Sequence, residues 1–289
     1  VDHWAARGVI SLKIKQATPD EARIIIDQAQ RHGMTTAGHL GNYRVEYDVT
    51  TRDAILMGID RIEHQLTLAL SRDDPRSAET DEMVRLMLEH EVFYDPNLQM
   101  YGGINLRQAN LEDMLWTDES VYFTPYTQAL LEARGPPPPE SAVEEYEQRV
   151  VELLALYRAG GKDLLIVGTD EPVYTSLLPG FAYHRELWAM AQAGLPNAVV
   201  LKAATINGAR SLGVAERLGS VEAGKLADLL VVRGDPLTNI KATRSLRHVI
   251  RAGAVHDPSV LLEAAKGKIG PSGPEDREDW VLQVPALRR

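Results

Sequence analysis

The sequence predicts an α/β fold in which parallel strands alternate with helices. A short apolar run at 9–14 is followed by a helical pattern that reaches about residue 32. The same order recurs at 34–40 and at 59–64, with a helical pattern between them. Because strands separated by helices pair in parallel, this alternation indicates a sheet covered by crossover helices.

The first long helix carries a start signal of its own. Thr18 is followed by Pro19, and Glu21 stands three residues after the threonine. This is a capping box with proline in the first turn, and Gly33 marks the end of the pattern.

The alternation continues further along the chain. We expect a helix at 81–90, a strand at 91–95, a long helix at 141–159 and a buried strand at 164–168. The aromatic, proline-rich segment 96–139 interrupts it. A lid, a packed helical excursion and a dimer contact all remain open for that segment.

The pattern changes to a β-rich one in the C-terminal third. Strands are expected at 225–232 and 248–254, and glycine, proline and charged residues dominate from 267 onward. We therefore expect a barrel-like part at 1–214, a small β-rich appendage at 215–257 and a C-terminal tail at 258–289.

Composition narrows the classes of partner. The 289 residues carry a net charge of -10 with no basic cluster, so a nucleic-acid partner is not expected. No apolar run approaches the ~18 residues of a membrane span. Cysteine is absent, so any metal would be held by nitrogen and oxygen ligands. The cellular compartment and the formation of a homo-oligomer are both left open.

Polar residues stand at or near the ends of successive apolar runs: Lys13, His39, His64 and Asp170. In a (β/α)₈ barrel such ends meet at the catalytic face. Two imidazoles, a carboxylate and a lysine that can become a carbamate suit a divalent metal such as Zn²⁺. Singly, either histidine is more often an ordinary hydrogen-bonded residue, and Asp170 could cap the next helix. Their joint placement favours the metal site.

Several separated motifs occur in a fixed order: Gly38-His39, Ile62-Glu63-His64, Ala203-Ala204-Thr205, and the run from Gly219 to Val232. This order resembles the amidohydrolase superfamily, and its C-terminal part is similar to imidazolonepropionase-like and prolidase-like members. The resemblance implies a partial TIM (β/α)₈ barrel, strands four to eight, plus the C-terminal strands of a small β-sandwich.

The resemblance also implies a role for each candidate. Lys13 matches the strand-four lysine that is carboxylated and bridges two metals, with Lys15 as the alternative because both face the same way. His39 and His64 match the strand-five and strand-six ligands. Asp170 matches the strand-eight aspartate, which binds metal, orients the hydroxide and moves its proton.

The sequence departs from the family at one point. The strand-one His-x-His pair has no counterpart, since no two histidines here are separated by a single residue. We therefore expect strands one to three and the first sandwich strands to lie before Val1.

The implied activity is hydrolysis of an amide-like C–N bond by metal-activated hydroxide. The expected substrates are small molecules, namely a peptide, an N-acyl amino acid or a cyclic amide. The alternative is a truncated or catalytically silent chain that acts as an interaction subunit. A nucleic-acid deaminase is disfavoured because its zinc signature needs cysteine.

Overall fold

The computed structural model describes residues 1–15, 17–40, 48–64, 66, 78–100, 115, 119–134, 139–170 and 180–276. The chain forms two compact units. The first comprises Val1–Leu98, Glu144–Gly168 and Met190–Lys225, and the second comprises Gln99–Val143, Thr169–Ala189 and Leu226–Arg289. This division follows compactness alone, so the boundaries at 214 and 257 stay a prediction.

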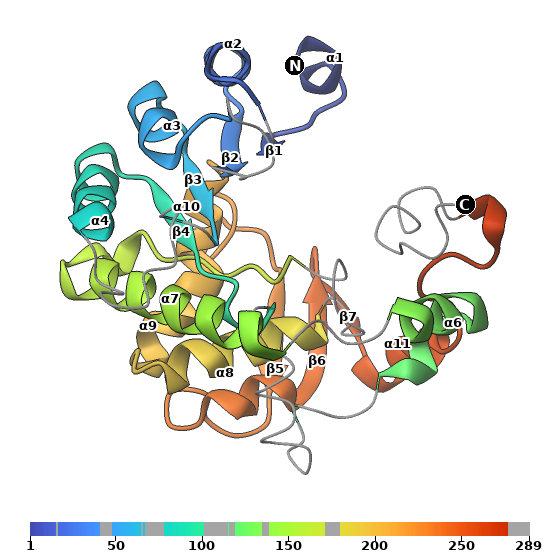
Figure 1. Cartoon of the computed structure of the whole chain (residues 1–289). Coiled ribbons are helices and arrows are strands. Elements are labelled where there is room, and N and C mark those ends of the chain that lie inside the picture. Colours follow the sequence, from blue (N-terminus) through green and yellow to red (C-terminus); the bar gives the residue numbers. More distant parts are fainter. Residues whose placement is uncertain are drawn as a thin grey trace. The chain divides into compact units, whose positions relative to one another are not determined.

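A parallel four-stranded sheet in the order β1-β2-β3-β4 forms the centre of the first unit. Its strands are β1 (Ser11–Lys15), β2 (Thr35–His39), β3 (Arg61–Glu63) and β4 (Phe93–Asp95). After the short α1 (Asp2–Ala5), the helices between strands are α2 (Pro19–Arg31), α3 (Thr51–Met57) and α4 (Ala78–His90), which follow one another beside the sheet (Figure 1). The predicted alternation of strands and helices is confirmed.

The two faces of this sheet have different roles. One face carries almost fully buried side chains, which alternate along the strands with those of the other face. These buried residues are Ile14, Thr36, Ile62 and Tyr94. The hydroxyl of Tyr94 donates to Glu152 of α7 (Pro139–Arg158) at 2.9 Å, so this face meets the helices. The side chains at the intervening positions therefore lie on the opposite face.

Helix α2 begins at the predicted capping box. The Glu21 backbone N–H donates to Thr18 Oγ1 at 3.3 Å, and the Thr18 N–H donates to Glu21 Oε2 at 2.9 Å. Both bonds satisfy donors that the first helical turn leaves without partners.

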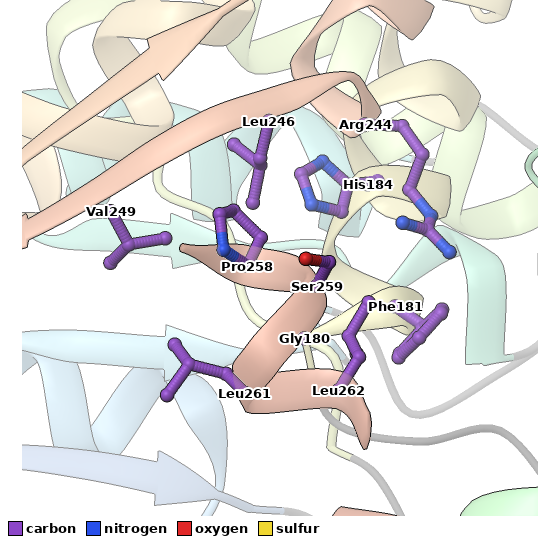
Figure 2. A pocket seen from close by; sticks show the side chains of 10 residues that line it. All are labelled: Gly180, Phe181, His184, Arg244, Leu246, Val249, Pro258, Ser259, Leu261 and Leu262. Carbon is purple, nitrogen blue, oxygen red and sulfur yellow. The ribbon is translucent and has the colours of Figure 1, made fainter. Parts of the chain in front are cut away.

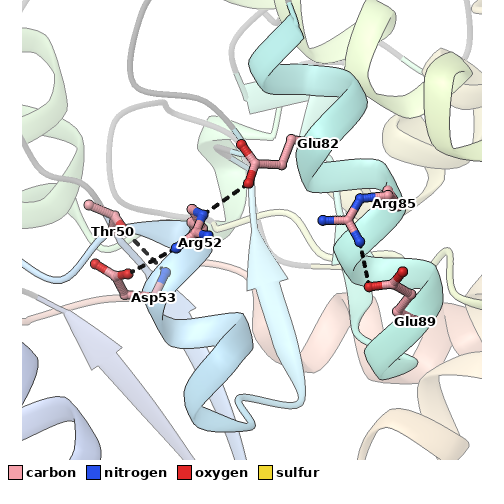
Figure 3. Close-up of polar contacts among 6 residues, drawn as sticks. All are labelled: Thr50, Arg52, Asp53, Glu82, Arg85 and Glu89. Atoms are coloured by element: carbon pink, nitrogen blue, oxygen red, sulfur yellow. Dashed lines mark hydrogen bonds and ion pairs between the residues drawn. The ribbon is translucent and has the colours of Figure 1, made fainter.

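Polar contacts also cap α3 and link it to α4 (Figure 3). Thr50 Oγ1 caps α3 by accepting from the Asp53 N–H at 3.1 Å. Arg52 on α3 reaches Glu82 on α4, with Nε and Oε1 2.9 Å apart. Both side chains are solvent-exposed, so the ion pair adds little to stability.

The expected strand at 164–168 is reduced to a single bridge between Leu165 and Tyr94. The short 3₁₀ turn η3 (Gly161–Asp163) precedes it. The Gly168 N–H then donates to the Asp95 side chain at 2.8 Å instead of to a backbone carbonyl. The segment thus runs beside β4, but a side chain takes the place of the next ladder bond.

The Ala-Ala-Thr motif lies in a helical segment that anchors this part of the chain. The segment consists of α9 (Asn197–Lys202), the π-helical turn η4 (Ala203–Asn207) and α10 (Gly208–Ser211). Asn207 is fully buried, and its Nδ2 donates to the carbonyls of Leu165 at 2.9 Å and Lys162 at 3.2 Å. This side chain therefore holds the residues that precede Asp170.

The second unit contains an antiparallel sheet in the order β5-β6-β7. Its strands are β5 (Leu229–Val232), β6 (Leu246–Arg251) and β7 (Ala254–His256). The expected strand at 248–254 is two strands, because Ala252 and Gly253 both take positive φ and reverse the chain. Its helical segments are η2 (Ser120–Tyr122), α6 (Pro125–Arg134), the start of α8 (Phe181–Gln192), η5 (Ile240–Arg244), α11 (Pro258–Ala265) and η6 (Pro274–Asp276).

The segment expected as a tail is structured at its start. Asp257 caps α11 by accepting from the Ser259 N–H at 2.8 Å, and α11 contacts β6. Further on, Thr127 Oγ1 donates to the carbonyl of Pro271 at 3.0 Å. Residues 277–289 lie outside the described part, as do Tyr101 and Trp116 of the aromatic segment.

None of the described helices combines the length and apolarity that crossing a membrane requires.

We expect Thr18→Ala to lower the free energy of unfolding by ~1 kcal/mol, because the first turn of α2 loses its hydroxyl acceptor. Urea denaturation measures the change. Thr18→Ser keeps the hydroxyl and should stay close to wild type. Equal losses in both variants would contradict the capping role.

Candidate active site

His39 and His64 meet at the carboxyl ends of two adjacent parallel strands. His39 is the last residue of β2, and His64 follows directly after β3. His39 Nδ1 lies 2.7 Å from His64 Nε2, and the two ring centroids are 4.3 Å apart with the planes at 71°. The structure thus brings together two of the residues that the sequence singled out.

His64 is held in a buried, strained position. Its φ of 48° is uncommon for a residue with a side chain, and its N–H donates to the Asp95 carbonyl at 2.6 Å. Burial is the main cause that holds the pKa of His64 well below its usual value, and the neighbouring His39 ring and the charge of Arg149 add to it. The His64 imidazole is therefore neutral at neutral pH, which is the form that binds metals.

Lys13 shares the face of the sheet that carries His39. Parallel pairing places Lys13 beside Ala37 and Lys15 beside His39, so both lysines lie on one side. Lys13 Nζ forms an ion pair with Glu63 Oε2. The choice of Lys13 over Lys15 as a metal ligand stays a prediction.

Glu63 and Asp95 are site residues to which sequence reasoning gave no role. They are register neighbours on β3 and β4, on the same face as Lys13 and His39. The signal was present, because each is a carboxylate at the end of an apolar strand, the criterion that selected the histidines.

Asp95 contacts the chain segment that leads to Asp170. Besides the bond from the Gly168 N–H, a side chain at Gly168 would place its Cβ 1.9 Å from Asp95 Oδ2, so only glycine fits there. Asp170 itself is half-buried with a φ of 48°. It belongs to the second unit, and its place in a common site with the histidines stays a prediction.

A buried polar network supports β4 from the helix side. Glu152 accepts from Arg149 Nη1 at 2.8 Å and from the Tyr94 hydroxyl at 2.9 Å, and all of these side chains are almost inaccessible to solvent. Burial first, and then the charge of Glu152, raise the pKa of Tyr94 well above its usual value. The phenol therefore stays protonated and donates its hydrogen bond.

The donor set at the strand ends fits part of a metal site. The two imidazole nitrogens share a hydrogen bond, so one of them carries its proton, and burial keeps the His64 ring neutral. Nitrogen ligation of Zn²⁺ needs neutral rings whose lone pairs face the ion. Among the residues that the structure describes, no group of three or more histidines and carboxylates is arranged around one point. The pair would supply two ligands of such a site.

His184 does not belong to this cluster. It lies on α8 in the second unit, where its Nδ1 is 3.1 Å from Thr243 Oγ1. Burial, assisted by the charges of Arg244 and Arg185, lowers the pKa of His184 to about 4.

Comparison with known proteins gives the family of the chain. The model of the Amidohydrolase family matches residues 13–256. The chain belongs to the amidohydrolase family. Its curated relatives include the imidazolonepropionase of Shouchella clausii (strain KSM-K16), 25% identical over 337 residues that cover 94% of this chain and 73% of the relative.

Solved structures confirm the α/β fold. An Xaa-Pro dipeptidase with bound methionine in its active site superposes with a TM-score of 0.61 at 22% identity, over 87% of this chain and 55% of that one. The A. niger ochratoxinase gives a TM-score of 0.60 at 19% identity, over 94% of this chain and 54% of that one. The chain therefore spans about half the length of these two proteins.

We expect NMR titration to give His184 a pKa of about 4, against an ordinary value of 6.5. The unfolded chain takes up this proton near pH 6.5, whereas the folded protein resists it until about pH 4. Stability should therefore fall as the pH drops through this window, by up to ~3 kcal/mol from this group. His184→Gln should make the decline shallower, and the exposed His3→Gln should not. An unchanged slope in His184→Gln would contradict the assignment.

Proposed function

We propose that the protein is a metal-dependent hydrolase that cleaves an amide-like C–N bond in a small molecule. The observation that carries the proposal is the 2.7 Å approach of His39 Nδ1 to His64 Nε2 at the ends of adjacent parallel strands. Membership in the amidohydrolase family supports it. Peptides, N-acyl amino acids and cyclic amides are the substrate classes, and the relatives' names, an imidazolonepropionase and an Xaa-Pro dipeptidase, favour small substrates.

In this proposal His39 and His64 hold a divalent ion, Zn²⁺ by the chemistry of the nitrogen donors, and Lys13 contributes a carbamate oxygen. A bound ion of this kind supplies a Lewis acid that makes hydroxide available near neutral pH. Burial keeps His64 neutral, so its lone pair is available without loss of a proton.

Asp170 supplies the general acid/base in the same proposal. Its carboxylate accepts the proton of the attacking water and returns it to the departing nitrogen. Two features of the described chain support a fixed position for the residues before it, namely the Asp95 bond to the Gly168 N–H and the Asn207 bond to the Leu165 carbonyl.

The metal site can be tested on the full chain without a substrate. We expect chelator-stripped protein to rebind Zn²⁺, and His39→Asn and His64→Asn each to weaken that binding at least ~10-fold, because each removes a nitrogen donor. His90→Asn, at an exposed position on α4, is the matched control. Competition with a chromogenic chelator measures the affinities. Wild-type affinity in both strand-end variants would remove the pair from the metal site.

We expect Asp170→Asn to remain folded and keep most of its Zn²⁺, because amide and carboxylate have nearly the same shape. Its kcat should fall ~10²-fold to 10⁴-fold, since an amide cannot carry the proton. The assay uses Xaa-Pro dipeptides, N-acyl amino acids and cyclic amides, with metal content measured on the same samples. Near-normal turnover in a metallated variant would exclude Asp170 from the mechanism. Zinc binding by the wild type without turnover of any class would favour the interaction-subunit alternative.

A further inference from the structure

A pocket of about 450 Å³ lies within the second unit, and none of the residues proposed to bind metal lines it. It is formed by the start of α8, the end of η5, β6 and α11 (Figure 2). Its volume lies in the range of sites for small organic ligands. The walls are mainly apolar and include Phe181, Leu246, Val249, Leu261 and Leu262.

Arg244 places a positive charge on one side of this pocket. Its guanidinium lies over the Phe181 ring, with its central carbon 4.2 Å from the ring centroid. Figure 2 shows these two side chains on one side of the pocket and Val249 and Leu261 on the other. Within the described part of the chain Arg244 forms no ion pair, because Glu119, the carboxylate that most affects it, is bound to Arg185.

The remaining polar groups in the wall do not compete with Arg244 for an anion. His184 is uncharged at neutral pH because its pKa is about 4, and its Nδ1 faces Thr243. The hydroxyl of Ser259 donates to Asp257 at 2.7 Å. Among the described residues that line the pocket, Arg244 is the charged one and none is an aspartate or glutamate.

We propose that this pocket binds a small organic carboxylate with an apolar body. The carboxylate pairs with Arg244, and the hydrocarbon part lies against Leu246, Val249 and Leu261. An inorganic anion would leave the apolar wall unused, and a neutral hydrocarbon would desolvate the guanidinium without giving it a partner. The site shares no residue with the proposed metal centre, so either can be absent while the other exists.

Decanoate is a suitable probe, with decan-1-ol as its neutral counterpart of equal chain length. We expect isothermal titration calorimetry on the full chain to show saturable binding of decanoate and at least ~10-fold weaker binding of the alcohol, since only the carboxylate pairs with Arg244. Arg244→Gln should weaken decanoate binding by a similar factor and leave the alcohol unchanged. Arg244→Lys, which keeps the charge, should retain more of the affinity than Arg244→Gln.

Two further variants separate a local effect from a loss of folding. Val249→Phe fills the pocket from the side opposite Arg244 and should abolish binding of both probes. Arg251→Gln removes an exposed arginine from the same strand and should bind like wild type. Circular dichroism and thermal unfolding confirm that each variant is folded. Equal affinity for decanoate in Arg244→Gln and wild type, equal affinity for acid and alcohol, or no binding of decanoate would each overturn the proposal.

Discussion

The parallel register of β1 to β4 determines which side chains can meet at the candidate active site. In this register Lys15 lies beside His39, and Glu63 lies beside Asp95. These four side chains are therefore on one face of the sheet, at the carboxyl ends of their strands. A shift of one residue in any strand would send its site residue toward the helices. The buried residues on the other face, such as Ile62 and Tyr94, oppose such a shift, because it would expose them to the polar side.

The pKa of His64 depends partly on a charged side chain that is buried on the helix side of the sheet. Arg149 is bound to Glu152, yet its positive charge still contributes to the low pKa of His64. The charge of Arg149 on the helix side thus adds to the effects of burial and of the His39 ring on His64. Loss of Arg149 or Glu152 would remove one of two opposite buried charges and would change the electrostatic environment of His64.

Local signals predicted much of the fold and part of the site. The capping box at Thr18 and Glu21 depends on residues three apart, and the structure confirms it. His39 and His64 could be found because strand ends follow from apolar runs and converge in a parallel sheet. The Lys13–Glu63 ion pair could not be found in the same way, because Lys13 lies on β1 and Glu63 on β3. Their contact depends on the register of two strand pairings, β1 with β2 and β2 with β3.

Other features depend on contacts between distant segments and were beyond the sequence pattern. The apolar run at 164–168 predicted a full strand, but the Asp95 side chain, far away in the sequence, takes the hydrogen bond of Gly168. The pocket of the second unit joins Phe181, Arg244 and Leu261, which no local periodicity connects. Composition alone also gave no sign that Asp257 would cap a helix within the expected tail.

The Lys13–Glu63 ion pair constrains how the lysine can be used in the proposed chemistry. Carbamate formation requires a neutral amine, whereas a carboxylate in direct contact favours the charged ammonium. In the proposed chemistry, the ion pair with Glu63 and a carbamate on Lys13 would therefore exclude each other. Lys13 retains 39% of its side-chain accessibility and Glu63 15%, so water can replace the partner of either group when the pair separates. A divalent cation near His39 would favour the carbamate, because it attracts the anionic oxygens and repels the ammonium. Glu63, although not expected as a ligand, would thus set how strongly metal binding and lysine modification depend on each other.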